Sequence, residues 1–476
     1  MAGFFIENFG CRAARADGEA VSARLCSTGL HELPLHDASL VIVNTCSVTA
    51  EADRAARAFI RRAHRRNPAA KIVVTGCYAQ RAPQELAPIA GVAAVVGNSH
   101  KALVPEIIRN LALGQMPSPA APLAIVPSAI VPVAALLTPP APIWADDRFA
   151  HSFIEDAHLA GAALASGAQT RPNLKIQEGC GNRCSFCVIP FTRGPSQSLS
   201  RAAILREVES FVEAGGKELV LSGINLGRWG RELPGAQCHA LPHLVRDILE
   251  QTTLPRLRLS SIEPMDWDDE LIALLREFAE SCAGRPRLAR HAHLPLQSGS
   301  DAVLRRMHRR YRPWHYAGKV AALMRAAGPD LTIGADVMAG FPGETDREFE
   351  ETLAFLRALP FGYLHLFPFS PRPDTPGWQM HTASPVPPAV LDERMAALRA
   401  LAAEKTHAHR SRFNGRALPA ITLNAPPALA AQSRTAALTD NFLPLQLEGC
   451  FPANHFVQAQ VTTISADGVL HAEALT

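Results

Sequence analysis

The chain has 476 residues, too many for one hydrophobic core, and a typical domain size of roughly 150 residues predicts about three domains. Apolar residues make up 47% and charged residues 19% of the sequence, which excludes a globally disordered chain. The net charge of +3 is too small to indicate a nucleic-acid-binding protein by itself, so any basic surface must be local.

The first residues, MAGFFIENFGCRAARADGEA, lack a basic segment followed by an apolar core, so we expect no secretory signal and a cytoplasmic protein. In that compartment the ten cysteines stay reduced, and clustered cysteines bind metal more often than they form disulfides. The uncharged stretch between Arg109 and Asp146 is repeatedly interrupted by proline, so we expect no membrane span. It is either a Pro/Ala-rich linker or an irregular loop packed on a neighbouring domain.

Ahead of this stretch, four β-rich runs alternate with helix-like segments, as in a parallel α/β sheet. The runs are residues 3–10, 40–46, 71–77 and 92–98. Three of them lead directly into a cysteine, at Cys11, Cys46 and Cys77. Because the carboxyl ends of parallel strands line a ligand crevice, these thiols could converge on a metal site. Taken singly, each is better interpreted as a small buried apolar residue, but three at equivalent strand ends favour a metal site.

After the Pro/Ala-rich stretch the alternation resumes with a longer period, and six strand-like runs predict an open, partial (β/α)6 barrel. Small and polar residues at the ends of these runs are expected to face one cavity, although each alone could be a turn former or a cap. These residues are Asn225, Ser260, Ser261, Glu263, Gln297, Ser298 and Asp336.

From about residue 410 the sequence changes to short β-like pieces separated by turn signals, which predicts a small β-barrel. We therefore expect an α/β domain over 1–111, a Pro/Ala-rich linker or insertion over 112–172, a partial barrel over 173–409 and a β-barrel over 410–476.

The stretch EGCGNRCSFCVIP places Cys180, Cys184 and Cys187 within eight residues without a fourth ligand nearby. A structural zinc site has four protein ligands, so zinc is disfavoured. The C-x3-C-x2-C spacing resembles the radical S-adenosylmethionine (SAM) superfamily. That resemblance implies a [4Fe–4S] cluster with one iron open to SAM, whose cleavage yields a 5′-deoxyadenosyl radical. Phe186 is placed to contact the adenine, or else belongs to the core.

The motifs KIQEGCGNRCSFCVIPFTRG, HLPLQSGSDAVLRRM, DVMAGFPGETDREFEET and FSPRPDTP, together with the first cysteine triad and the final barrel, resemble the radical SAM methylthiotransferases. These enzymes replace a C–H bond with C–SCH3. The resemblance implies a second [4Fe–4S] cluster on Cys11, Cys46 and Cys77, which delivers the sulfur, and two SAM molecules used in turn. Phe186 and the strand-end residues Asn225, Ser261, Glu263, Gln297, Ser298 and Asp336 are the candidate cofactor contacts.

Within this family the chain is most similar to the branch that acts on N6-threonylcarbamoyladenosine at position 37 of tRNA. The similarity lies in the stretches NTCSVTAEADRAARAFIRRAHRRNP and SGINLGRWG. The resemblance implies the anticodon stem-loop of tRNA as a partner, with a one-electron reductant such as a flavodoxin or ferredoxin and a sulfur donor. The alternatives are isopentenyladenosine in tRNA, an aspartate of a ribosomal protein, or a non-catalytic iron–sulfur RNA-binding protein.

Two arginine clusters suit contacts with a phosphate backbone, although each arginine singly could lie on a solvated helix face. The final barrel resembles a TRAM domain, but its arginines are balanced by acidic residues. His291 and His293 share one strand face and are interpreted as structural histidines. The arginine clusters comprise Arg54, Arg57, Arg61, Arg62, Arg65 and Arg66, and then Arg305, Arg306, Arg309, Arg310 and Arg312.

Overall fold

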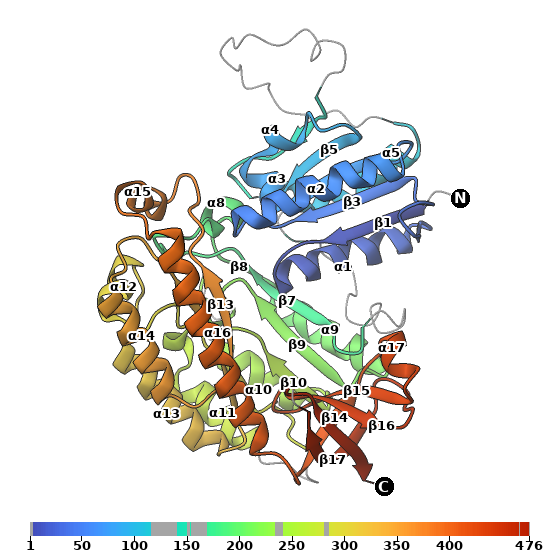
Figure 1. Ribbon diagram of the computed structural model, residues 1–476. Coiled ribbons are helices and arrows are strands. Elements are labelled where there is room, and N and C mark those ends of the chain that lie inside the picture. The colour runs from blue at the N-terminus through green and yellow to red at the C-terminus, as the bar shows by residue number, and fades with distance from the viewer. Residues whose placement is uncertain are drawn as a thin grey trace. The chain divides into compact units, whose positions relative to one another are not determined.

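The computed structural model describes residues 3–115, 140–149, 153, 169–233, 241–279, 285–465 and 467–475 (Figure 1). Most of the predicted linker over 112–172 lies outside the described residues. None of the described helices is long and apolar enough to span a membrane. The chain forms two compact units, the first made of Met1–Ala157, Glu178–Asn182 and Cys187–Pro195, and the second of the remaining segments.

The first unit contains a six-stranded parallel sheet in the order β2-β1-β3-β4-β5-β6. The apolar runs predicted β1, β3, β4 and β5, whereas the two-residue strands β2 and β6 were not predicted. The order reverses between β1 and β3, and in open α/β sheets a ligand crevice opens at the carboxyl ends of the strands at such a point. The strands are β1 (Gly3–Asn8), β2 (His31–Glu32), β3 (Leu40–Thr45), β4 (Lys71–Gly76), β5 (Val92–Gly97) and β6 (Ile143–Trp144).

Both faces of this sheet are covered, because side chains alternate along each strand. Val41 and Val43 of β3 pack on one side against α2, α3 and α4. Leu40 and Ile42 pack on the other side against α1 and α5. The helices are α1 (Arg12–Ser27), α2 (Ala50–Arg66), α3 (Cys77–Arg81), α4 (Pro83–Leu86), the 3-10 helix η1 (Asn98–Leu103), α5 (Val104–Ala112) and α8 (Ile189–Arg193).

The second unit contains the six predicted strands of the partial barrel, confirming an open (β/α)6 arrangement. Together with the two-residue strand β8, which was not predicted, they form two sheets, β8-β7-β9-β10 and β11-β12-β13. Isolated bridges at Leu257–Leu288 and Ser261–His293 connect the two sheets. The strands are β7 (Asn173–Glu178), β8 (Gln197–Ser198), β9 (Glu218–Gly223), β10 (Arg256–Leu259), β11 (His291–His293), β12 (Thr332–Ala339) and β13 (Phe361–Pro368).

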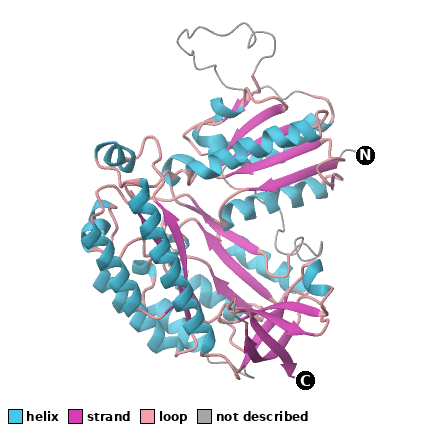
Figure 2. Ribbon diagram, viewed as in Figure 1, coloured by secondary structure: helices cyan, strands magenta, loops and turns pink. Residues whose placement is uncertain are grey.

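The helices of the second unit cover the outer side of these strands (Figure 2). Ile333, Ala335 and Val337 of β12 belong to the apolar core shared with the helices, so the alternate residues of β12 face the inner side of the half barrel. The helices are α9 (Arg201–Glu213), η2 (Leu226–Arg228), α10 (Leu241–Gln251), η4 (Pro264–Asp266), α11 (Asp269–Ala279), α12 (Asp301–Arg306), α13 (Pro313–Ala327), α14 (Asp346–Ala358), α15 (Pro376–Ala383) and α16 (Pro388–Ser411).

The predicted C-terminal barrel is a closed five-stranded barrel in the order β14-β15-β16-β18-β17. One strand, β15, was not predicted, because its sequence RTAALT is rich in alanine and has no strong β-forming run. The elements are β14 (Ala417–Thr422), α17 (Pro427–Ala430), β15 (Arg434–Thr439), β16 (Pro444–Glu448), β17 (Phe456–Ile464) and β18 (Leu470–Leu475).

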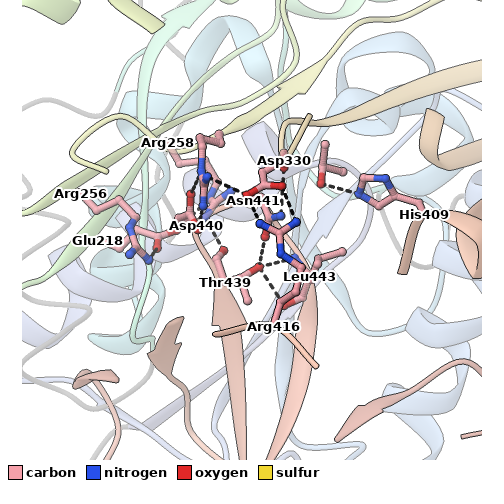
Figure 3. Close-up of polar contacts among 12 residues, drawn as sticks. Glu218, Arg256, Arg258, Asp330, His409, Arg416, Thr439, Asp440, Asn441 and Leu443 are labelled. Carbon is pink, nitrogen blue, oxygen red and sulfur yellow. Dashed lines mark hydrogen bonds and ion pairs between the residues drawn. The ribbon is translucent and has the colours of Figure 1, made fainter. Parts of the chain in front are cut away.

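A buried charge network joins the β-barrel to the half barrel (Figure 3). Glu218, at the start of β9, is fully buried and pairs with Arg171 at 2.7 Å, Arg256 at 3.3 Å and Arg258 at 2.8 Å. Burial would raise the pKa of Glu218, but Arg258, Arg171 and Arg256 bring it well below its usual range. Arg258 also donates to the carbonyl oxygen of Thr439 in the barrel at 3.0 Å, so Glu218 orients the arginine that holds the barrel.

A second set of ion pairs continues this junction. Arg290 contacts Asp440 of the barrel at 2.6 Å and Asp330 at 3.2 Å. Arg416, which precedes β14, pairs with the same Asp330 at 2.7 Å. Because Asp440 is completely buried, the charge balance counted from the sequence does not describe the barrel surface.

Replacing Glu218 with Gln should leave buried arginines without their anion and lower the free energy of unfolding at pH 7 by about 3–5 kcal/mol. The folded pKa of Glu218 lies below the unfolded one. Its stabilisation is therefore fully present above the unfolded pKa of about 4.3 and is lost as the pH falls. Urea unfolding should show the gap between wild type and variant shrinking below about pH 4.

The matched control is Glu277→Gln, since Glu277 pairs with Arg246 but leaves 48% of its side chain exposed. We expect that change to cost less than about 1 kcal/mol. Similar losses in both variants would contradict a special role for the buried network.

Candidate active site

The first cysteine triad lies where the parallel sheet predicts, at the carboxyl ends of neighbouring strands. Cys11 precedes α1, Cys46 follows β3, and Cys77 is the first residue of α3 directly after β4. Gly10 has a positive φ of 104°, and a Cβ on it would lie 2.9 Å from Cys46 Sγ. A glycine at this position therefore lets the first cysteine loop approach the second.

The thiols of this triad influence one another. Burial raises the pKa of Cys46 to about 12, and the neighbouring thiols of Cys77 and Cys11 add to the effect. A bare thiolate is costly in such a place, whereas coordination to metal keeps a thiol deprotonated. Three converging thiols in a partly buried crevice thus fit a cluster bound through cysteine.

Beside Cys77 lies Arg193 of α8, which the sequence analysis missed. It is fully buried, donates from Nε to Cys77 Sγ at 3.2 Å, and contacts Glu178 at 2.6 Å and Asp17 at 3.1 Å. Lys101 bonds to Asp17 at 2.7 Å and to Glu178 at 3.3 Å. Burial would lower the pKa of Arg193, but Cys77, Glu178 and Asp17 raise it above its usual range. The guanidinium is therefore a permanent cation at a thiol.

Further side chains fix the loops that carry the thiols. Asn98 donates to Cys77 Sγ at 3.4 Å and to the carbonyl oxygen of Thr192 at 2.7 Å. After Cys46, the hydroxyl of Ser47 donates to Asp53 at 2.8 Å, and Arg81 contacts both of those residues. The crevice is thus organised by hydrogen bonds that no short motif reveals.

The second triad, Cys180, Cys184 and Cys187, lies on the loop between β7 and α8, and all three residues are half-buried. The amide of Cys180 donates to the carbonyl oxygen of Gly194 at 3.1 Å, and its sulfur accepts from the amide of Asn182 at 3.4 Å. Three half-buried thiols on one loop fit a four-iron cluster that is held through three of its irons.

A second buried arginine contacts this loop within the second unit. Arg309 donates to Cys184 Sγ at 3.3 Å and forms an ion pair with Glu263. Burial would lower the pKa of Arg309, but Tyr311, Glu263 and Cys184 raise it above its usual range. The sequence analysis grouped Arg309 with residues that contact phosphate, and its burial makes that interpretation wrong.

The candidate cofactor contacts fall into different environments. Ser261, just beyond the end of β10, forms an isolated bridge with His293 of β11. Glu263, two residues later, contacts Arg309, which in turn contacts the cysteine loop at Cys184. The backbone amide of Asn225 donates to the side chain of Gln177 at 2.7 Å.

The remaining candidates are placed as follows. Gln297 has a positive φ of 68° and donates its amide to the carbonyl oxygen of Asp336 at 2.8 Å. Ser298 is fully buried, and its hydroxyl contacts Thr352 of α14 at 3.0 Å, so it supports the turn from the outer side. Asp336 lies between two histidines, His293 and His365. Phe186 is half-buried and packs against the apolar core.

Known proteins resemble both parts of this arrangement. Residues 3–97 match the family described as uncharacterized protein family UPF0004, and residues 174–356 match the radical SAM superfamily. The threonylcarbamoyladenosine tRNA methylthiotransferase MtaB of Aquifex aeolicus is 31% identical over 93% of this chain and 96% of its own length. The chain belongs to the radical SAM methylthiotransferases.

Two further similarities concern the substrate branch and the fold. The tRNA-2-methylthio-N(6)-dimethylallyladenosine synthase of Erythrobacter litoralis is 33% identical over 83% of this chain and 80% of its own length. The structure of the radical SAM methyltransferase TsrM from Kitasatospora setae has a TM-score of 0.53 at 16% identity, covering 79% of this chain and 77% of that one. The latter likeness supports the fold alone.

As a methylthiotransferase, the protein uses SAM and two [4Fe–4S] clusters, for which the two triads are the fitting thiol sets. Cys180, Cys184 and Cys187 would hold one of these clusters, which would supply the electron for the cleavage of SAM. The chain's own residues hold the clusters and SAM and orient them. Arg193 and Arg309 each donate a hydrogen bond to one sulfur of a triad, Cys77 Sγ and Cys184 Sγ, and so fix the position of that sulfur.

The thiol sets predict the metal content of the protein. Anaerobically reconstituted protein should contain roughly eight irons and eight sulfides per chain, because each triad holds one four-iron cluster. Replacing Cys11, Cys46 and Cys77 with Ala should halve both values to about four. Iron and sulfide analysis checks this, with Cys26→Ala, an exposed cysteine outside both triads, as the control.

Proposed function

We propose that this chain adds a methylthio group to C2 of N6-threonylcarbamoyladenosine at position 37 of tRNA. The observation that carries the proposal is the match to the Aquifex aeolicus methylthiotransferase along almost the full length of both chains. The dimethylallyladenosine synthase matches at similar identity over less of each chain, so isopentenyladenosine in tRNA is the second candidate.

Within this proposal, SAM contacts the inner side of the half barrel near the second triad. Ser261 and Glu263 support this placement, because both lie just after β10 and Glu263 is linked through Arg309 to Cys184. Phe186, Asn225 and Gln297 are proposed as further contacts. Ser298 is proposed only as a support, because its hydroxyl is engaged by α14.

For tRNA, we propose α2 as the contact surface for phosphates. Arg54 pairs with Glu51, and Arg57 contacts Tyr78 and Glu85, so both are engaged within the fold. At the other end of α2, the exposed Arg61 and Arg65 make no ion pair with any described residue. Exposed, unpaired arginines one turn apart suit electrostatic contact with a nucleic-acid backbone.

Arginines of the second cluster are less suited to contact phosphates, because they are paired with carboxylates. Arg305 and Arg312 both pair with Asp301, at 2.9 and 3.1 Å, and Arg306 pairs with Glu348 at 2.8 Å. These guanidinium groups already have carboxylate partners, so they are weaker candidates for phosphate contacts than α2.

Nucleoside analysis tests the substrate. Cells lacking the protein should lose 2-methylthio-N6-threonylcarbamoyladenosine and retain the unthiolated nucleoside, as measured by mass spectrometry of digested tRNA. Wild-type protein should restore the product, and Cys180→Ala should not, since it removes a cluster ligand. Loss of the isopentenyl derivative instead would assign the second candidate, and unchanged tRNA would contradict a tRNA substrate altogether.

Salt dependence tests the surface on α2. The double change Arg61→Ala and Arg65→Ala should reduce the slope of log affinity for tRNA against log salt by roughly two units, about one unit for each arginine that no longer meets a phosphate. Cleavage of SAM without tRNA should be unaffected. Arg246→Ala is the matched control, because Arg246 is a helical arginine with a 42% exposed side chain that is already paired with Glu277 and Glu250. An unchanged slope in the double variant would exclude α2 as the contact surface.

A further inference from the structure

Three potential metal ligands come together on the inner side of the half barrel, apart from both cysteine triads. They are His293 of β11, Asp336 of β12 and His365 of β13. The strand register explains the meeting, since His293 pairs with Gly334, two residues before Asp336, and Asp336 pairs with His365. Residues paired across strands, or two apart along one, share a face of the sheet.

The distances fit a shared cation better than a pair of hydrogen bonds. His293 Nε2 and His365 Nδ1 each lie 3.3 Å from the same oxygen, Asp336 Oδ1, and all three ligand atoms lie within 4.8 Å of one another. Charge-assisted hydrogen bonds from nitrogen to a carboxylate are shorter, about 2.7–2.9 Å. Two ligands held about 2.0–2.1 Å from a tetrahedral zinc ion lie roughly 3.3 Å apart.

One of these nitrogens is buried without a hydrogen bond. Within the part of the chain that the structure describes, His293 Nε2 has no hydrogen-bond partner of ordinary geometry, and only 9% of the side chain is exposed. An unsatisfied buried nitrogen costs free energy, which a bound cation would recover. The sequence analysis interpreted His293 as structural and did not consider His365.

Neighbouring rings hold the two imidazoles in place. Tyr363 packs beside both of them, with its ring centre 5.9 Å from that of His293 and 5.0 Å from that of His365. Gly334 leaves the room for this ring, because a Cβ at that position would lie 2.1 Å from a carbon of Tyr363. Rings fixed by packing are preorganised ligands, which lowers the entropic cost of binding a metal.

The carboxylate is accessible, since 24% of the Asp336 side chain is exposed. The side chain of His365 is 51% exposed, so a metal ion can enter from that side.

We propose that His293, Asp336 and His365 bind one zinc ion. Two histidines and one carboxylate form a ligand set that zinc takes with a fourth position open to water or to an anionic oxygen of a bound molecule. The proposal does not rest on the two clusters or on the tRNA substrate proposed above, and it assigns Asp336 to zinc in place of the cofactor contact expected from the sequence.

Metal analysis of the full chain tests the site. Protein with both clusters reconstituted, so that the six thiols are occupied, is equilibrated with zinc sulfate, desalted and analysed by mass spectrometry for zinc and iron. We expect about one zinc per chain for wild type and less than about a tenth for His365→Ala and Asp336→Ala. His407→Ala, an exposed histidine on α16, should keep the wild-type zinc. Unchanged iron content shows that a variant is folded.

X-ray absorption at the zinc edge of the wild-type protein gives a second test that needs no variant. The expected spectrum shows only nitrogen and oxygen ligands, including two imidazoles, at about 2.0–2.1 Å. A sulfur shell at about 2.3 Å, zinc retained by both ligand variants, or no zinc in the wild type would each overturn the proposal.

Discussion

The burial of Arg193 is the constraint around which the first unit is built. A guanidinium with no exposed surface is stable only if anions surround it, and here the anions come from α1, from the end of β7 and from the thiol that begins α3. Because Arg193 and Lys101 share the carboxylates of Asp17 and Glu178, removing either carboxylate leaves a positive charge uncompensated in the interior. The same residues that make the burial tolerable also fix the position of Cys77. The second unit uses the same device, with Arg309 between Glu263 and Cys184.

Sheet topology then decides which residues can meet. In the first unit, the reversal of strand order between β1 and β3 places two of the thiols on either side of the crevice, and β4 supplies the third. In the half barrel, parallel register places side chains from three strands at one level of the inner face, which is how His293, Asp336 and His365 meet. Both arrangements follow from strand pairing and not from closeness in sequence.

This difference explains what the sequence could predict. Apolar runs ending in cysteine predicted both the strands and the convergence of the first triad, because strand ends are marked locally. The contacts of Arg193 and Arg309 with the thiols could not be predicted, because no pattern near these arginines in the sequence indicates that Asp17 or Glu263 lies beside them. His365 escaped for the same reason, because its partner Asp336 belongs to a different strand. The alanine-rich β15 was missed because its strand character comes from its neighbours in the barrel.

The three cysteines of the first triad lie far apart in the sequence, so a metal cluster bound to them would cross-link the chain. Cys11, Cys46 and Cys77 close two loops of roughly thirty residues each, so a cluster bound to all three is a three-way cross-link of the kind that a disulfide makes between two points. The apolar layers of the sheet do not include these sulfurs in their central packing, and they would survive the loss of that cross-link. Loss of a cluster would then free the loops that carry the three cysteines and leave the sheet and its helices folded.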